Sequence, residues 1–291
     1  MSHYGQPTGH IPIYLPQKIT KSYIVLSGEP VCAPSADATY HPEIIIKPGS
    51  LEAYELEVKV NDSNISGQIE STYKSDHAKL KVFLEKSNTL IDFRHSAARE
   101  DAMILAKTLP ILMGANSNVH QDYSFYGMFP SWVGYESVRL EPLGIRQLTD
   151  KEADEILNKL SGEKINKPLI AILQNLAHGL SIDNVAENRI VALQSILEAI
   201  LFKDEDPSHS PTAAVLRLKI ISLYNQSHVA GHTSDLKKMI NIRGGYIHRL
   251  KANGYTDEIL GWTLGLTLDV IRDYILGRIP DTAKMLEQKL G

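Results

Sequence analysis

The spacing of apolar residues changes near residue 148, and this change constrains the fold more than any other feature of the sequence. Before it, residues 54–60 alternate between apolar and charged side chains, which is the two-residue period of a half-buried β-strand. After it, apolar residues recur every three or four positions, as in residues 184–202, and this is the period of an amphipathic helix. The sequence therefore predicts an α+β protein, with a mainly β domain over residues 1–148 and an all-α domain over residues 149–291.

The N-terminal domain contains further strand patterns and one interruption. Residues 96–113 are rich in Ala, Leu and Met and predict a helix that Pro110 ends or bends. Residues 116–130, which contain Tyr and Gly, are expected to form a long loop. The other predicted strands are residues 65–73, 79–84 and 132–140. The pattern of this domain resembles no family, and we expect it to be a sensor or target-binding element.

The C-terminal half begins and continues with helix signals. Thr149 and Glu152 have the spacing of a capping box, in which each side chain satisfies a free backbone amide of the other residue at a helix start. Pro211 suits the first position of a later helix. The helices predicted after the capping box cover residues 169–180, 184–202, 211–225, 234–252 and 256–276.

Composition restricts the compartment in which this chain is expected to work. Cys32 is the single cysteine, so no intramolecular disulfide can form, which suits a reducing compartment. Residues 1–21 lack the apolar run of a signal peptide, and no stretch approaches the roughly 20 apolar residues of a membrane span. The expected location is therefore the cytoplasm, with no membrane partner.

The charge distribution bears on nucleic-acid binding. A formal net charge of −4 does not favour a protein that coats nucleic acid through bulk electrostatics. However, residues 236–256 contain no acidic side chain and five Lys or Arg side chains. Such a stretch is either a solvated helix face or a local site for phosphate groups.

The most informative segment is residues 240–249, INIRGGYIHR, in which four residues separate Arg243 from His248. This segment resembles the signature of the HEPN family, in which an Arg is followed by a His after four to six intervening residues. In the Apea-like subgroup of that family a hydrophobic residue precedes the Arg and a small residue follows it, as Gly244 does here. The helices before and after the segment also resemble the family, so the resemblance covers roughly residues 150–291.

The resemblance implies an all-helical bundle that pairs into a homodimer and cleaves RNA at the dimer interface, without a metal ion or cofactor. By analogy alone, it also implies a role in antiviral defence or as a toxin. Two positions depart from the broader family pattern, because Gly244 stands where a polar residue is common and Arg249 stands where Gly is common.

RNA cleavage needs residues of these two types. The neighbouring 2′-hydroxyl is the nucleophile, so the protein must remove its proton, protonate the leaving 5′-oxygen and stabilise the charge on the phosphorane. His248 is the candidate general acid or base, because histidine titrates at a pKa of about 6.5. Arg243 is the candidate that stabilises the transition state, because its charged fork of donors matches phosphate oxygens. One pair is too few for separate acid and base roles, and a twofold dimer supplies a second pair.

Residues around the motif are expected to assist it. Asn241 either orients one of the two catalytic candidates or lies on a solvated face. Gly244 and Gly245 are poor helix formers, so they predict a kink or the close approach of a backbone or a phosphate. Tyr246 is expected either to contact RNA or to pack against a neighbouring helix. The candidate phosphate contacts are Lys237, Lys238, Arg249 and Lys251.

Helix geometry adds two expectations. Residues five positions apart lie about 140° apart on an ideal helix, so Arg243 and His248 should flank a groove. Glu198 lies in an otherwise apolar helix, and buried acids usually need a partner. It is expected to pair with Arg243 or Arg217, or to be exposed to solvent.

Other interpretations of the sequence remain open. The chain is alternatively a non-catalytic platform that dimerises and binds RNA or protein, or a protein whose N-terminal domain binds a small ligand or carbohydrate. His228 and His232 have a metal-ligand spacing, but no carboxylate or Cys close in sequence completes a set, so exposed loop histidines are favoured. Nothing near Cys32 indicates a nucleophile. The sequence has no phosphate-binding loop, dinucleotide fingerprint, HExxH or GxSxG motif.

Overall fold

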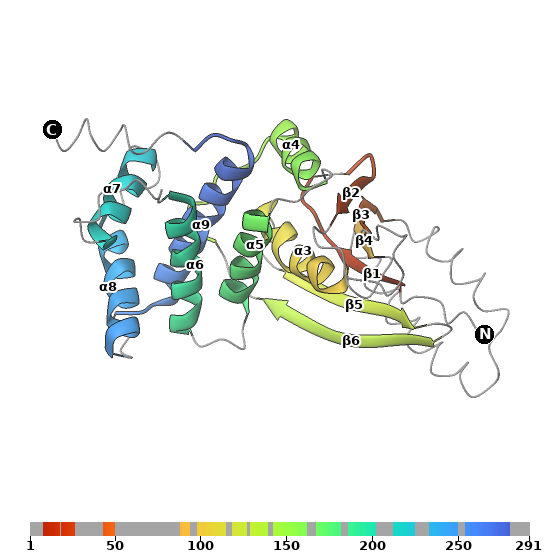
Figure 1. Ribbon diagram of the computed structural model, residues 1–291, viewed down its shortest axis with the longest axis horizontal. Coiled ribbons are helices and arrows are strands. Elements are labelled where there is room, and N and C mark those ends of the chain that lie inside the picture. The colour runs from red at the N-terminus through yellow and green to blue at the C-terminus, as the bar shows by residue number, and fades with distance from the viewer. Residues whose placement is uncertain are drawn as a thin grey trace, which may run out of the picture. The chain divides into compact units, whose positions relative to one another are not determined.

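The computed structural model describes residues 8–17, 19–26, 43–49, 88–93, 98–114, 118–126, 129–138, 142–161, 167–181, 186–201, 212–224, 233–249 and 254–279. The chain divides into two compact units, which are labelled by element in Figure 1. The first unit contains Met1–Arg139 and Thr149–Ile170, and the second contains Leu140–Leu148 and Ala171–Gly291. The fold is α+β, as the sequence predicts.

The first unit is built on an antiparallel sheet. Its described strands follow the order β2-β3-β4-β1-β5-β6, and each neighbouring pair is antiparallel. The strands are β1 (Thr8–Ile13), β2 (Tyr23–Leu26), β3 (Glu43–Pro48), β4 (Thr89–Phe93), β5 (Asn118–Tyr126) and β6 (Phe129–Val138).

One face of this sheet carries the core of the unit. Ile44 lies opposite Val25 on one side and Phe93 on the other, and all three are buried. Ile24, between two buried neighbours on β2, is exposed, as the two-residue period of a strand requires. Helix α3 (Arg99–Leu112) packs on β1, β4 and β5. This helix falls within the predicted range of residues 96–113.

The loop predicted over residues 116–130 is wrong. Strand β5 fills Asn118–Tyr126, and β6 pairs with it from Phe129 to Val138 across a register shift between Asp122 and Tyr123. Val119, Tyr123 and Phe125 do occupy alternate positions, but the polar residues between them and the nearby glycines concealed this period. The predicted strand over residues 132–140 overlaps β6. The strands predicted over residues 54–60, 65–73 and 79–84 lie outside the described residues.

Helix α4 (Asp150–Leu160) begins at the predicted capping box. The amide of Glu152 donates to the Thr149 hydroxyl at 3.3 Å, and the Thr149 amide donates to the Glu152 carboxylate at 3.1 Å. This helix was expected in the all-α domain, but it clusters with the sheet. The Tyr23 hydroxyl on β2 donates to Asp154 at 2.8 Å and joins the two elements. A cap fixes where a helix begins, but it does not determine which core the helix packs against.

The second unit is helical. Its helices include α6 (Ala186–Leu201), α7 (Thr212–Tyr224), α8 (Thr233–Arg249) and α9 (Asp257–Ile275), and α5 (Lys167–Leu180) enters it from Ala171 onwards. These ranges confirm the helices predicted in this half of the chain.

Helix α9 is the centre of the second unit. It packs against α6 and α8, and every residue from Ile259 to Arg272 is buried. Its N-cap is Thr256, whose hydroxyl accepts from the Ile259 amide at 3.2 Å. Across the ranges that the structure describes, no helix is both long enough and apolar enough to span a bilayer.

Candidate active site around Arg243

Arg243 occupies an inward-facing position of α8. Leu236, Met239, Arg243 and Ile247 follow one another at spacings of three, four and four residues, so they lie on one stripe of the helix. Leu236 and Met239 are fully buried, the Arg243 side chain is about a quarter exposed, and Ile247 is 47% exposed. The core therefore ends at Arg243, and the arginine lies at its edge.

Glu198 on α6 holds the guanidinium in place. The Nη2 atom of Arg243 donates to Oε2 of Glu198 at 2.9 Å, between two helices that pack together. Their side chains are 26% and 20% exposed. Of the expected partners for Glu198, the structure selects Arg243, and Arg217 is exposed on α7. A charge-assisted bond of this kind fixes the orientation of the arginine fork.

The bond between Glu198 and Arg243 engages only one nitrogen of the guanidinium. Burial raises the pKa of Glu198, and the nearby Arg243 opposes that shift. The Nε atom of Arg243 is buried and has no hydrogen-bond partner among the described residues. An arginine has five N–H donors, and the bond to Glu198 engages one nitrogen. The guanidinium therefore keeps N–H donors besides the one that binds Glu198, and its side chain is 26% exposed.

Position 248 lies on a different stripe of the same helix. Lys237, Asn241, Gly244 and position 248 follow one another at spacings of four, three and four residues. Lys237 and Asn241 are exposed, so this stripe faces solvent over its described length. Helix α8 continues without a break to Arg249, which places positions 243 and 248 about 140° apart. The side chains of His248 and Arg249 lie outside the described residues, and so does all of Lys251.

The expected assisting residues fall into three environments. Lys238 is exposed and forms an ion pair with Asp235 at 3.1 Å. Tyr246 is partly buried, whereas a Cβ atom at Gly244 would meet nothing within 4 Å. The kink expected at Gly244 and Gly245 is not found, because both residues lie inside the continuous helix. The open space beside Gly244 leaves room for another backbone or a phosphate to approach.

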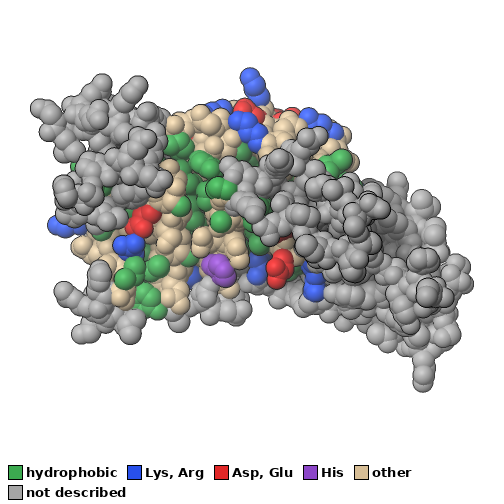
Figure 2. Space-filling view, in the orientation of Figure 1, with side chains coloured by type: hydrophobic (Ala, Val, Ile, Leu, Met, Phe, Trp, Pro, Cys, Tyr) green, Lys and Arg blue, Asp and Glu red, His purple; other side chains and the backbone are tan. Residues whose placement is uncertain are grey.

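Charged side chains of both signs are mixed on the described surface (Figure 2). On the face shown in Figure 2, the Lys and Arg side chains of the described residues are scattered and interspersed with Asp and Glu. Within the part of the chain that the structure describes, no cluster of His, Cys, Asp or Glu could hold a metal ion. His228 and His232 lie outside the described residues.

Two buried polar features of the second unit were not anticipated from the sequence. Gln194, one turn before Glu198 on α6, is 1% exposed, and its Oε1 atom has no partner among the described residues. Asp269 and Arg272 form a fully buried ion pair on α9. Their three-residue spacing inside an otherwise apolar helix is the signal that could have indicated the pair.

Comparisons of this chain with models of protein families, with curated proteins and with solved structures give no match. Function is therefore inferred from the residues of the site and from the chemistry they allow.

Proposed function

We propose that this protein is a metal-independent endoribonuclease of the HEPN type, acting as a homodimer in antiviral defence or as a toxin. One observation carries the proposal. Arg243 occupies the last inward position of α8 before the core ends, where Glu198 holds it and leaves other donors available. Position 248 lies on a different stripe of the same helix, about 140° around its axis. A charged arginine at a core edge beside a titratable histidine position suits the binding and cleavage of a phosphodiester.

In the proposed reaction the 2′-oxygen of one nucleotide attacks the adjacent phosphorus. A bond forms between that oxygen and phosphorus, and the bond from phosphorus to the 5′-oxygen breaks. His248 of one subunit takes the proton from the 2′-hydroxyl, and the second copy of His248 in the dimer protonates the leaving 5′-oxygen. The products are a 2′,3′-cyclic phosphate and a 5′-hydroxyl, and no oxidant, reductant or metal is consumed.

Arg243 and Glu198 divide the remaining work. Arg243 donates to the non-bridging phosphate oxygens, whose charge increases in the transition state. Glu198 is a positioning residue, because it contacts the guanidinium and fixes the direction of its fork. Lys237 and Lys238 are exposed on the same helix and are proposed to contact neighbouring phosphates.

The deciding experiment incubates the purified full chain with total RNA in the presence of a chelator. We expect cleavage to persist and to leave cyclic phosphate ends. His248→Ala should reduce the rate by on the order of 10²–10⁴-fold, the usual contribution of a general acid or base. Arg243→Lys keeps the charge but loses the fork, and we expect a loss on the order of 10²-fold or more.

The matched control is His178→Ala, which removes an exposed histidine at the end of α5. It should cleave at the wild-type rate. Equal cleavage by wild type and His248→Ala would refute the proposal. RNA binding without cleavage in every variant would instead favour the non-catalytic platform.

A further inference from the structure

Residues 142–148, here named the clasp, lie along one stripe of α9. Gly261 and Gly265 form the start of that stripe, one turn apart. The Leu143 amide donates to the Gly261 carbonyl at 2.9 Å. A Cβ atom built at Gly265 would lie 2.0 Å from the Leu143 carbonyl oxygen, which is closer than any real contact. Only glycine at position 265 therefore allows the clasp to lie this close to the helix.

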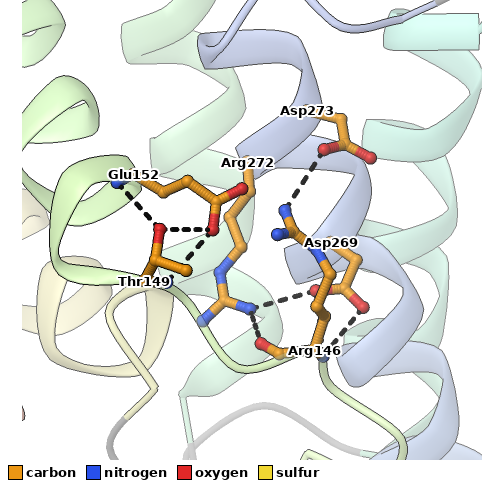
Figure 3. A network of polar contacts seen from close by, with 6 residues as sticks. All are labelled: Arg146, Thr149, Glu152, Asp269, Arg272 and Asp273. Carbon is orange, nitrogen blue, oxygen red and sulfur yellow. Dashed lines mark hydrogen bonds and ion pairs between the residues drawn. The ribbon is translucent and has the colours of Figure 1, made fainter.

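The same stripe continues to Asp269 and Arg272, which bind the backbone of the clasp (Figure 3). The Arg146 amide donates to both carboxylate oxygens of Asp269, at 3.2 and 3.1 Å. The Nη1 atom of Arg272 donates to the Arg146 carbonyl at 2.5 Å and to Asp269 at 3.0 Å. Both side chains of this pair are at most 2% exposed. The peptide groups of one clasp residue thus bind both members of a buried ion pair.

This arrangement favours two discrete states of the clasp over a gradual loosening. If the backbone of Arg146 moved away, Asp269 and Arg272 would each lose a charge-assisted hydrogen bond inside the core. Buried charged groups tolerate such losses poorly. Gly144, with a φ of 70°, provides the turn between the Leu143 and Arg146 attachment points.

The path of the chain connects the clasp to the other unit. The clasp belongs to the second unit, yet the residues on both sides of it in sequence, up to Arg139 and from Thr149, belong to the first. Strand β6 ends at Val138, and α4 begins at Asp150. In sequence, the clasp therefore lies between two elements of the first unit.

Helix α9 connects the clasp to the candidate active site. It packs against α6, which carries Glu198, and against α8, which carries Arg243. The position of α9 therefore influences how these two helices meet. The bond between Glu198 and Arg243 is sensitive to that geometry, because it depends on both distance and direction.

We propose that the clasp is a regulatory latch for the Arg243 site. Seated on α9, it keeps α6 and α8 in the arrangement in which Glu198 orients Arg243, and cleavage proceeds. When a rearrangement of the first unit withdraws the clasp, that arrangement loosens and cleavage falls. The latch rests on the proposed function for its catalytic consequence, while the coupling between clasp and site can be measured without RNA cleavage.

A matched pair of substitutions on α9 tests how firmly the clasp is held against that helix. Asp269→Asn weakens the buried bonds to the Arg146 backbone, whereas Asp273→Asn changes a partly exposed carboxylate that contacts the Arg146 side chain at 3.4 Å. Gly265→Ala displaces the clasp by a clash and leaves the polar groups intact. We expect hydrogen exchange at residues 142–148 to accelerate about tenfold or more in Asp269→Asn and Gly265→Ala, and to change little in Asp273→Asn.

The rate of RNA cleavage should fall in the same variants whose clasp exchanges faster. We expect it to fall about tenfold in Asp269→Asn and Gly265→Ala and to remain at the wild-type level in Asp273→Asn. Circular dichroism identifies any variant that has not folded. Accelerated exchange of the clasp in a folded variant that cleaves RNA normally would overturn the latch and leave the proposed function standing.

Reciprocity provides a test that needs neither a clasp variant nor catalysis. If clasp and site are coupled, a change at the site must alter the clasp to a corresponding degree. We expect Glu198→Gln to accelerate exchange at residues 142–148, although it lies on another helix. We also expect a 2′-O-methyl RNA, whose blocked nucleophile prevents cleavage, to slow that exchange in the wild type.

The outcomes separate the two proposals. If the wild type does not cleave RNA, the proposed function fails. Hydrogen exchange of the clasp in Glu198→Gln then decides whether the clasp and the Arg243 site are coupled. Unchanged exchange at residues 142–148 in Glu198→Gln would then overturn the coupling. Accelerated exchange would support the coupling even in a protein that acts on another substrate.

Discussion

Two arginine–carboxylate pairs of the second unit, at Arg272 and at Arg243, lie in contrasting environments. Arg272 and Asp269 lie three residues apart on α9, and their side chains are 0% and 2% exposed. Arg243 and Glu198 join two different helices, and their side chains are 26% and 20% exposed. The first pair binds the clasp backbone, whereas the second lies where the core of α8 gives way to solvent.

The difference teaches how the same chemical pair can serve structure or function. Around Arg272, two buried hydrogen bonds from Nη1, to Asp269 and to the Arg146 carbonyl, hold the guanidinium at a place that solvent does not reach. Around Arg243, the hydrogen bond to Glu198 orients the guanidinium, and the partial exposure lets a ligand reach it. A buried pair of this kind specifies one arrangement of the chain. A pair at a core edge is positioned and still accessible, which is what binding requires.

The largest expected effect is on stability, and it tests whether the two pairs differ in environment. Arg272→Met leaves the Asp269 carboxylate buried without its cation, and we expect a loss of about 3–5 kcal/mol in the free energy of unfolding. Arg243→Met leaves a partly exposed carboxylate, for which solvent compensates, and we expect a loss of about 1 kcal/mol or less. Urea denaturation followed by circular dichroism measures both. Similar losses in the two variants would mean that the pairs do not differ in environment.

A smaller expected effect is a dependence of stability on pH that arises from Glu198, the partner of Arg243. Burial raises the pKa of Glu198 in the folded state above its unfolded value, with Arg243 opposing. As the pH rises through the normal range of glutamate, the unfolded state loses this proton first, so the folded state loses stability until the raised pKa is passed.

Glu198→Gln has no titrating carboxylate at this position, so it is the control for the wild type. The stability of wild type relative to Glu198→Gln should therefore be greatest near the acid end of that range and should decrease as the pH rises toward 7. Unfolding curves for both proteins across the range give the difference. A wild type that gains stability over Glu198→Gln with rising pH would show that Arg243, and not burial, dominates.

The smallest expected effect extends the comparison to the fully exposed side of α8. Lys238 is already paired with Asp235, whereas its neighbour Lys237 is exposed on the stripe that leads to position 248. We expect Lys237→Ala to weaken RNA binding and to lower the dependence of log affinity on log salt by about one. Lys238→Ala should change both less, because the carboxylate partly cancels its charge. A larger effect of Lys238→Ala would place the RNA path on the other side of the helix.

Local signals in the sequence were sufficient for most helices. The helix predicted over residues 256–276 is observed at Asp257–Ile275, because its cap and its apolar period are both encoded within a few turns. The capping box predicted α4 correctly. It groups with the first unit through contacts such as the bond between Tyr23 and Asp154, which are far apart in sequence, and no local pattern contains that information.

The candidate site was only partly predictable for the same reason. Helical spacing indicated that positions 243 and 248 lie on different stripes of α8, and the structure bears this out. Spacing could not decide between Arg243 and Arg217 as the partner of Glu198, because that choice depends on how three helices pack. The clasp was missed altogether, since Arg146 meets Asp269 across more than a hundred residues of chain.

The division of the chain into units determines where it can be cut. A polypeptide that starts at Thr149 matches the change in sequence pattern, but it would lack the clasp and leave the α9 stripe from Gly261 to Arg272 uncovered. A polypeptide that starts at Leu140 retains the clasp, and it also contains α4, which belongs to the first unit. A fragment of the helical half therefore needs these nine additional residues if this stripe of α9 is to stay covered by its own chain.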